Sequence, residues 1–185
     1  MTRHPNLLQQ KETALVIIDI QERIHKVMAE PARVIDNTAK LIRGCKVLGV
    51  PLYYTEQYPK GLGPTVEPLR VLLGEQPPII KSRFSVCCET ELVQPLQDLR
   101  IKQILLAGIE AHVCCLQSAL DFQNMGFQVH LAADATSSRQ AFHYDWALQR
   151  MQQNGVTLTN AESALFELLE VSGTDQFKQI SAIIK

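Results

Sequence analysis

Three residues with complementary chemistry stand at or just beyond the ends of short apolar runs. Asp19 follows ALVII, Lys81 closes IIK, and Cys114 lies shortly after QILLA. A thiol can attack a carbonyl carbon, a carboxylate can accept the proton of that thiol, and an ammonium can stabilise the thiolate. Taken singly, the same residues are explained by helix capping, a solvated surface charge and core packing. Their occurrence together predicts a nucleophilic site.

The elements that must position these residues alternate between strands and helices. Strands are predicted from short apolar runs at 14–18, 51–55, 79–81, 103–107, 128–133 and 156–158. Helices are predicted from longer stretches with helical spacing at 34–48, 66–73, 90–99, 114–125, 141–153, 161–169 and 175–183. This alternation is typical of βαβ units. We expect an α/β fold of three α/β/α layers, in which a six-stranded, mostly parallel, Rossmann-like sheet has the order 3-2-1-4-5-6.

In an open parallel sheet, ligands bind beyond the carboxyl ends of the strands, where the strand order reverses. Asp19, Lys81 and Cys114 all fall at or near such ends, so we expect them to share one site. A helix N-terminus and the Lys81 ammonium both favour a thiolate, whereas Asp19 opposes it. We therefore expect a moderately lowered pKa for Cys114. Cys115 points about 100° away around a helix, so at most one of the two thiols faces the site.

Length and composition indicate a globular protein. The 185 residues, 46% hydrophobic and 20% charged, predict one domain over 1–185 with an N-terminal tail at 1–12. A net charge of −1 gives no general basis for binding nucleic acid, and no apolar run approaches the roughly 20 residues of a membrane helix. The first residues do not resemble a secretory signal, so we expect a cytoplasmic location, with a short organelle-targeting tail left open.

The five cysteines comprise a single Cys45 and two adjacent pairs, Cys87–Cys88 and Cys114–Cys115. Adjacent cysteines are poor staples for distant loops, so we expect free thiols in a reducing compartment. The role of Cys87 and Cys88 stays open between packed or exposed thiols and a redox pair.

The chain carries three motifs, VIIDIQ, IIKSRFS and GIEAHVCC, whose order and spacing resemble those of the isochorismatase-like cysteine hydrolases. This superfamily includes nicotinamidases and N-carbamoylsarcosine amidases, and the resemblance extends over about residues 11–169. It implies that Asp19, Lys81 and Cys114 are the catalytic residues and that the protein forms homo-oligomers.

The resemblance also implies a particular turn before the nucleophile. The family often has a non-proline cis peptide in this turn, which here falls at Ile109–Glu110. Such a turn would direct backbone N–H groups near Ala111 and Cys114 toward an oxyanion.

The stretch TEQYPKGLGPT at 55–65 departs from the nicotinamidase pattern. That pattern includes an Asp-x-His and a further His that bind a metal, whereas this stretch has no histidine and one carboxylate, Glu56. We therefore expect no metal and no cofactor. The stretch instead resembles the isochorismatase-domain-containing branch of the superfamily, and the nucleophilic cysteine separates the chain from isochorismatase itself.

Residues that flank the motifs are candidates for a substrate pocket. Gln21, Phe84 and His112 each stand beside a motif, although packing explains them equally well. Tyr58 and Leu62 lie in the Pro/Gly-rich loop and are candidates for a lid.

These observations predict a cysteine hydrolase that cleaves a small amide or amide-like substrate through a thioester intermediate. The expected partner is a small molecule, with no nucleic acid and no membrane. A non-enzymatic interaction protein on the same fold is an alternative, since a fold does not establish a function. An RNA-cleaving enzyme is a weaker alternative, because the chain has a near-neutral charge and no basic, aromatic-rich stretch.

Overall fold

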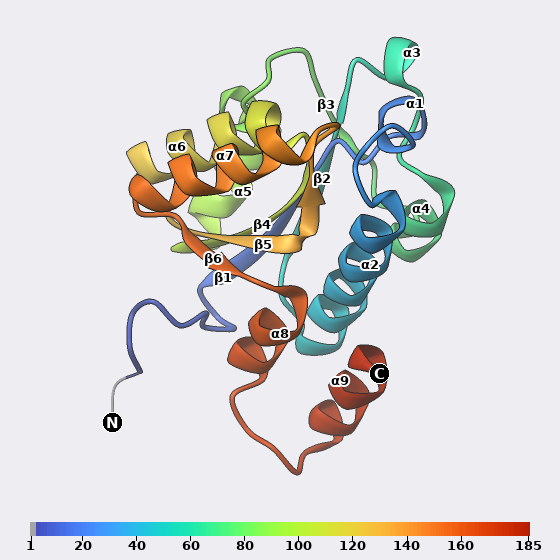
Figure 1. Ribbon diagram of the computed structural model, residues 1–185. Helices are drawn as coiled ribbons and strands as arrows, with labels where there is room; N and C mark the ends of the chain where they lie inside the picture. Colours follow the sequence, from blue (N-terminus) through green and yellow to red (C-terminus); the bar gives the residue numbers. More distant parts are fainter. Residues whose placement is uncertain (1–2) are drawn as a thin grey trace.

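A parallel sheet of six strands forms the centre of the computed structural model, which describes residues 3–185 (Figure 1). The strand order is β3-β2-β1-β4-β5-β6, so the predicted fold class and order are confirmed. The strands are β1 (Thr13–Ile18), β2 (Leu52–Gln57), β3 (Ile79–Lys81), β4 (Gln103–Ile109), β5 (Gln128–Ser137) and β6 (Thr157–Thr159). The order reverses at β1, because β2 pairs with one edge of β1 and β4 with the other.

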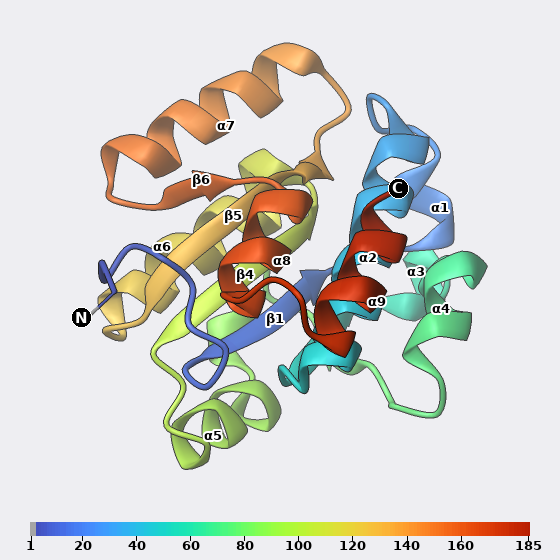
Figure 2. The ribbon, with the colours of Figure 1, turned by 90° about the horizontal axis from the view of Figure 1, so that it is seen from below.

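Helices cover both faces of the sheet (Figures 1 and 2). One face packs against α2 (Pro31–Leu48), α4 (Glu67–Leu73), α8 (Ala161–Leu169) and α9 (Asp175–Ile184). The other face packs against α5 (Thr90–Asp98), α6 (Leu116–Asn124) and α7 (Ala141–Gln153). None of the helices among residues 3–185 is both long and apolar enough to cross a membrane.

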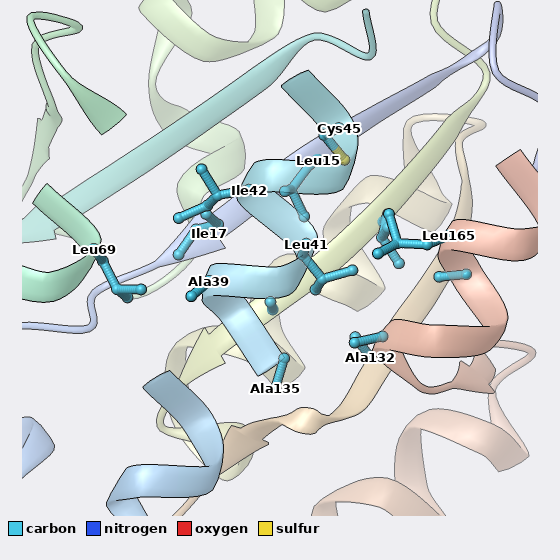
Figure 3. Close-up of a cluster of buried hydrophobic side chains, with 14 of the residues drawn as sticks. Leu15, Ile17, Ala39, Leu41, Ile42, Cys45, Leu69, Ala132, Ala135 and Leu165 are labelled. Atoms are coloured by element: carbon cyan, nitrogen blue, oxygen red, sulfur yellow. The ribbon is translucent and has the colours of Figure 1, made fainter. Parts of the chain in front are cut away.

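The central strand β1 is buried on both faces, which explains its unbroken apolar sequence. Leu15 and Ile17 point into the layer formed by α2, where they lie near Leu41 and Ile42 (Figure 3). The alternate residues of β1 point into the opposite cluster. Each large aliphatic side chain buried in this way contributes about 1.5–3 kcal/mol to the free energy of folding.

Short elements near the site differ from the prediction. Helices α1 (Glu22–His25) and α3 (Pro59–Leu62) are four residues each, which is too short to produce a periodic pattern in the sequence. The helical backbone before α6 begins at Ala111 as a single π-helical turn, three residues earlier than expected. This turn is wide because the N–H of Cys115 donates to the carbonyl of Glu110, five residues back.

The second half of the expected N-terminal tail packs against the domain through hydrogen bonds and one buried side chain. The buried Gln103 side chain accepts a hydrogen bond from the backbone N–H of Gln9 and donates to the carbonyl of Leu7. Leu8, between them, is fully buried. These contacts hold the chain in place as it enters β1.

A histidine is buried in the middle of β5. His130 is fully buried, and neither ring nitrogen has a hydrogen-bond partner among the described residues. Burial lowers the pKa of His130 from its ordinary 6.5 to about 4, because a charged imidazolium would lose its hydration there.

We expect His130 to make the protein less stable in acid. As the pH falls below 6.5, the unfolded chain binds a proton that the folded chain excludes until about pH 4, so the free energy of unfolding decreases over this interval. The loss over the whole interval is roughly 3 kcal/mol. Urea unfolding at several pH values should show a weaker acid dependence for His130→Leu than for the wild type. Substitution of the exposed His4 is the control, and equal acid dependence in wild type and His130→Leu would contradict the prediction.

Candidate active site

The sheet brings three separated strand ends to one place. Asp19 directly follows Ile18, the last residue of β1, and Lys81 is the last residue of β3. Cys114 lies in the π-helical turn that follows β4, the neighbour of β1 on the other side. β2 lies between β1 and β3, so the long side chain of Lys81 has to pass this strand to reach Asp19.

Lys81 forms a buried ion pair with Asp19. Its Nζ lies 2.6 Å from Asp19 Oδ2, and the two side chains are 0% and 3% exposed. The same Nζ lies 3.7 Å from the Sγ of Cys114. Removing one member of a buried pair costs about 3–5 kcal/mol, because the remaining charge loses its partner without regaining water. Replacing either Asp19 or Lys81 alone should therefore lower the free energy of unfolding.

Neutral groups hold both charges in position. Lys81 Nζ donates to Oε1 of Gln57 at 2.6 Å and lies 3.2 Å from each of the carbonyl oxygens of Arg83 and Phe84. Thr55 Oγ1 donates to Asp19 Oδ1 at 2.7 Å. Gln57 and Thr55 were not predicted from the sequence. Only their position in the sheet could have pointed to them. Both lie on β2, the strand between β1 and β3, and Gln57 is the register partner of Lys81.

The second carboxylate oxygen of Asp19 is held differently from the first. Oδ2 receives no hydrogen bond of good geometry from the described residues, so its contact with Lys81 is ionic in character. Asp19 also has a φ of 52°, in the left-handed region that few residues other than glycine adopt. Such conformations often occur at functional sites, where the surroundings enforce them.

The thiol of Cys114 is neutral at rest. Burial, the nearby Asp19 carboxylate and the Lys81 ammonium act on it together, and the result is a pKa raised from 9.0 to about 12. Burial is the largest cause, Asp19 raises the pKa further, and Lys81 lowers it. The expected moderate lowering of this pKa is therefore wrong, because loss of hydration outweighs the attraction of the ammonium.

The adjacent Cys115 belongs to the core. It is fully buried within the cluster beneath α6 and α7, and burial raises its pKa well above the usual value. Cys114 lines a cavity and Cys115 does not. All five cysteines are free thiols, with Cys87 half-buried and Cys88 exposed.

The turn before Cys114 is sterically constrained. The Ile109–Glu110 peptide bond is cis. Gly108 has a φ of 129°, and a Cβ at this position would lie 2.2 Å from the carbonyl oxygen of Ile18, so only glycine fits where β4 passes the end of β1. The Glu110 carboxylate accepts from the N–H and the guanidinium of Arg139, at 3.0 and 3.1 Å, which fastens the turn to the chain after β5.

A small cavity opens onto the thiol. Its volume is about 100 Å³, well below the roughly 300–1,000 Å³ of pockets that enclose drug-sized ligands. Its walls are formed by apolar and polar residues in near-equal number: Asp19, Ile24, Gln57, Leu62, Phe84, Ile109, Glu110, Val113 and Cys114. Phe84, a candidate pocket residue, and Leu62, a candidate lid residue, both lie in this wall.

Gln21, Tyr58 and His112 do not line the cavity. Gln21 is fully buried, and its amide binds the backbone of Gln57 and Gly63, so it supports the loop from behind. Tyr58 is exposed and borders a separate surface groove beside β3.

His112 turns toward α7 instead of the cavity. Its Nδ1 is hydrogen-bonded to Ser138 at 2.9 Å, and its ring packs on His143 with 4.5 Å between the ring centroids. Burial lowers the pKa of His112. Within the described part of the chain, no three His, Cys, Asp or Glu side chains are grouped so that they could hold a metal ion.

Comparisons with known proteins agree with this architecture. Residues 13–163 match the isochorismatase domain family. "Isochorismatase domain-containing protein 1" of Danio rerio is 38% identical over 168 residues, which cover 90% of this chain and 59% of that protein. The chain thus spans about three fifths of the length of this relative.

Two solved structures illustrate the similarity in three dimensions. The MAR1 ribonuclease of Caenorhabditis elegans is 35% identical, with a TM-score of 0.88 over 96% of this chain and 92% of that one. The ycaC gene product of Escherichia coli, described as an octameric hydrolase of unknown specificity, shares the fold at 22% identity, with a TM-score of 0.90 over 99% of this chain and 91% of that one. Because its sequence matches the family over residues 13–163 and its structure matches solved members of the fold, the chain belongs to the isochorismatase family and has the hydrolase fold of that family.

Proposed function

We propose that this protein is a cysteine hydrolase that cleaves a small amide or amide-like substrate through a thioester. One observation carries the proposal: the thiol of Cys114 and the carboxylate of Asp19 line one small cavity, and Lys81 Nζ lies 2.6 Å from Asp19 and 3.7 Å from Cys114. A purely structural role needs neither a buried ion pair next to a thiol nor an opening onto it.

The neutral thiol determines the order of events. Because the pKa of Cys114 is raised to about 12, the proton leaves as the sulfur attacks the carbonyl carbon, and Asp19 accepts it. Lys81 stabilises the negative charge that develops on sulfur and keeps the carboxylate in place. The C–N bond then breaks, and Asp19 returns the proton to the departing amine. Water attacks the thioester, which releases a carboxylic acid and restores the thiol.

We propose that the turn before Cys114 binds the oxyanion. The backbone N–H groups of Ala111 and Cys114 are the candidates, because both belong to the π-helical turn that directly follows Gly108 and Glu110, and the contacts of these two residues hold it in place. An oxyanion-hole donor is worth about 10²–10³ in turnover. No metal or cofactor takes part in this scheme.

Self-association and a cytoplasmic location complete the proposal. Phe142 and Trp146 of α7 lie one helical turn apart and are 72% and 47% exposed, which is unusual for large apolar side chains and supports contact between copies of the chain.

RNA cleavage is the second candidate, favoured by the ribonuclease designation of the C. elegans relative. The site supports it less well. A cavity of about 100 Å³ is small for a nucleotide, and the net charge of −1 provides little attraction for a polyanion. A protein that only binds partners is the remaining alternative, and it predicts no turnover at all.

Replacement of Cys114 should abolish amide hydrolysis. We expect Cys114→Ala to lose at least about 10³-fold in turnover, because the covalent step is lost. Ammonia release from a panel of small amides measures the effect, and a chelator should leave the wild-type rate unchanged. The matched control is Cys115→Ala, which removes a neighbouring thiol outside the cavity and should retain activity. Equal activity in wild type and Cys114→Ala would exclude the cysteine mechanism.

Substitutions in the ion pair should separate thiol reactivity from catalysis. Asp19→Asn removes the charge that raises the thiol pKa, so alkylation of Cys114 by iodoacetamide should become about tenfold faster, while hydrolysis falls about 10²-fold or more. Lys81→Met should slow both reactions. The double variant, in which neither charge remains, controls for folding, which thermal unfolding monitors. If Asp19→Asn slowed alkylation as much as hydrolysis, Asp19 would be structural and not a base.

Single-stranded RNA should remain intact under conditions that support amide hydrolysis. Gel analysis of a labelled RNA incubated with wild type, Cys114→Ala and Cys115→Ala tests this expectation. Cleavage that persists equally in all three proteins indicates a contaminating nuclease. Cleavage lost only in Cys114→Ala would establish the second candidate in place of the first.

A further inference from the structure

We infer that the cavity admits a compact, uncharged acyl group and excludes one that carries a carboxylate. As a statement about substrates, this inference rests on the proposed function. It concerns which molecules can reach Cys114, and so it can be tested without turnover.

The ammonium at the site has no capacity left for a second anion. Lys81 Nζ has three protons, and five atoms already surround it: Asp19 Oδ2, Gln57 Oε1, two backbone carbonyl oxygens and the sulfur of Cys114. Its side chain is fully buried. A substrate carboxylate would have to displace one of these partners, which would leave that group buried and unpaired.

The described residues of the cavity wall provide no cation of their own. No Lys or Arg of residues 3–185 lines it, whereas two carboxylate residues, Asp19 and Glu110, do. Arg139, the partner of Glu110, lies outside the lining with its side chain 60% exposed. An anion inside the cavity would therefore lose hydration without gaining an opposite charge, which is the costly case for burial.

The small volume of the cavity and the apolar residues in its wall also favour a compact, uncharged acyl group. Five of the nine lining residues are apolar: Ile24, Leu62, Phe84, Ile109 and Val113. At about 100 Å³ the cavity holds a short acyl group and the scissile bond, with little room beyond them. Short aliphatic amides and related neutral carbonyl compounds are the class that fits.

Iodoacetamide and iodoacetate provide a matched pair of probes, because they differ in one end group and transfer nearly the same fragment to a thiol. We propose to measure the rate of labelling of Cys114 by each reagent, using peptide mass spectrometry. The ratio of the two rates is compared with the ratio for the same residue in the urea-unfolded chain, which removes the intrinsic difference between the reagents. Folding should raise the preference for iodoacetamide at least about tenfold.

Two variants identify the cause of the preference. Leu62→Arg places a cation in the cavity wall and should restore labelling by iodoacetate, whereas Leu62→Gln, polar but uncharged, should not. Phe84→Ala widens the wall at a half-exposed position and should admit iodoacetanilide, a larger neutral reagent, which the wild type should exclude.

The outcomes separate this inference from the proposed function. A ratio that is the same in folded and unfolded protein would overturn the inference, as would equal effects of Leu62→Arg and Leu62→Gln. If selective labelling is found but no amide is hydrolysed, the cavity selects as inferred and the hydrolase proposal fails. If anionic amides are hydrolysed as fast as neutral ones, the hydrolase proposal stands and the inference fails.

Discussion

The site depends on one buried ion pair, between the ammonium of Lys81 and the carboxylate of Asp19. Lys81 extends from the end of β3 past β2 to Asp19 at the end of β1, and its side chain is fully buried. Removing two charges from water costs several kcal/mol for each ion, and good geometry with additional hydrogen bonds must offset this cost. Gln57 and Thr55 on β2 supply such bonds. The strand order therefore explains both why the charges meet and why the fold tolerates them.

Burial also determines the protonation state of the Cys114 thiol. A solvated thiol beside an ammonium would ionise more readily, but loss of hydration at Cys114 outweighs that attraction and leaves a neutral thiol next to a carboxylate. In the proposed mechanism, the proton of this thiol moves to Asp19 as the sulfur attacks the carbonyl carbon. A small opening without a cation among the described lining residues adds a second restriction, on the charge and size of what can enter.

The sequence predicts the fold and the proximity of Asp19, Lys81 and Cys114 better than it predicts the groups around them. Apolar runs identify the strands, and Asp19, Lys81 and Cys114 are conspicuous because ionisable groups are unexpected at buried strand ends. Gln57 and Thr55 could not be found in this way, since neutral polar residues are common at strand ends and only the register with β3 and β1 reveals their partners. The lowered thiol pKa expected from the sequence is wrong for a related reason: residue types indicate nearby charges, whereas the depth of burial depends on the packed structure.

The proposed mechanism requires Cys114 itself to carry the acyl group during hydrolysis. The most direct measurement is acid quenching of the protein during turnover of amides with two to four carbons, followed by peptide mass spectrometry. We expect the peptide containing Cys114 to become heavier by the mass of the acyl group, and hydroxylamine to remove the added mass, as it does for a thioester. Turnover with the acyl group on another residue, or with no acylated peptide under conditions that stabilise thioesters, would contradict the proposed mechanism.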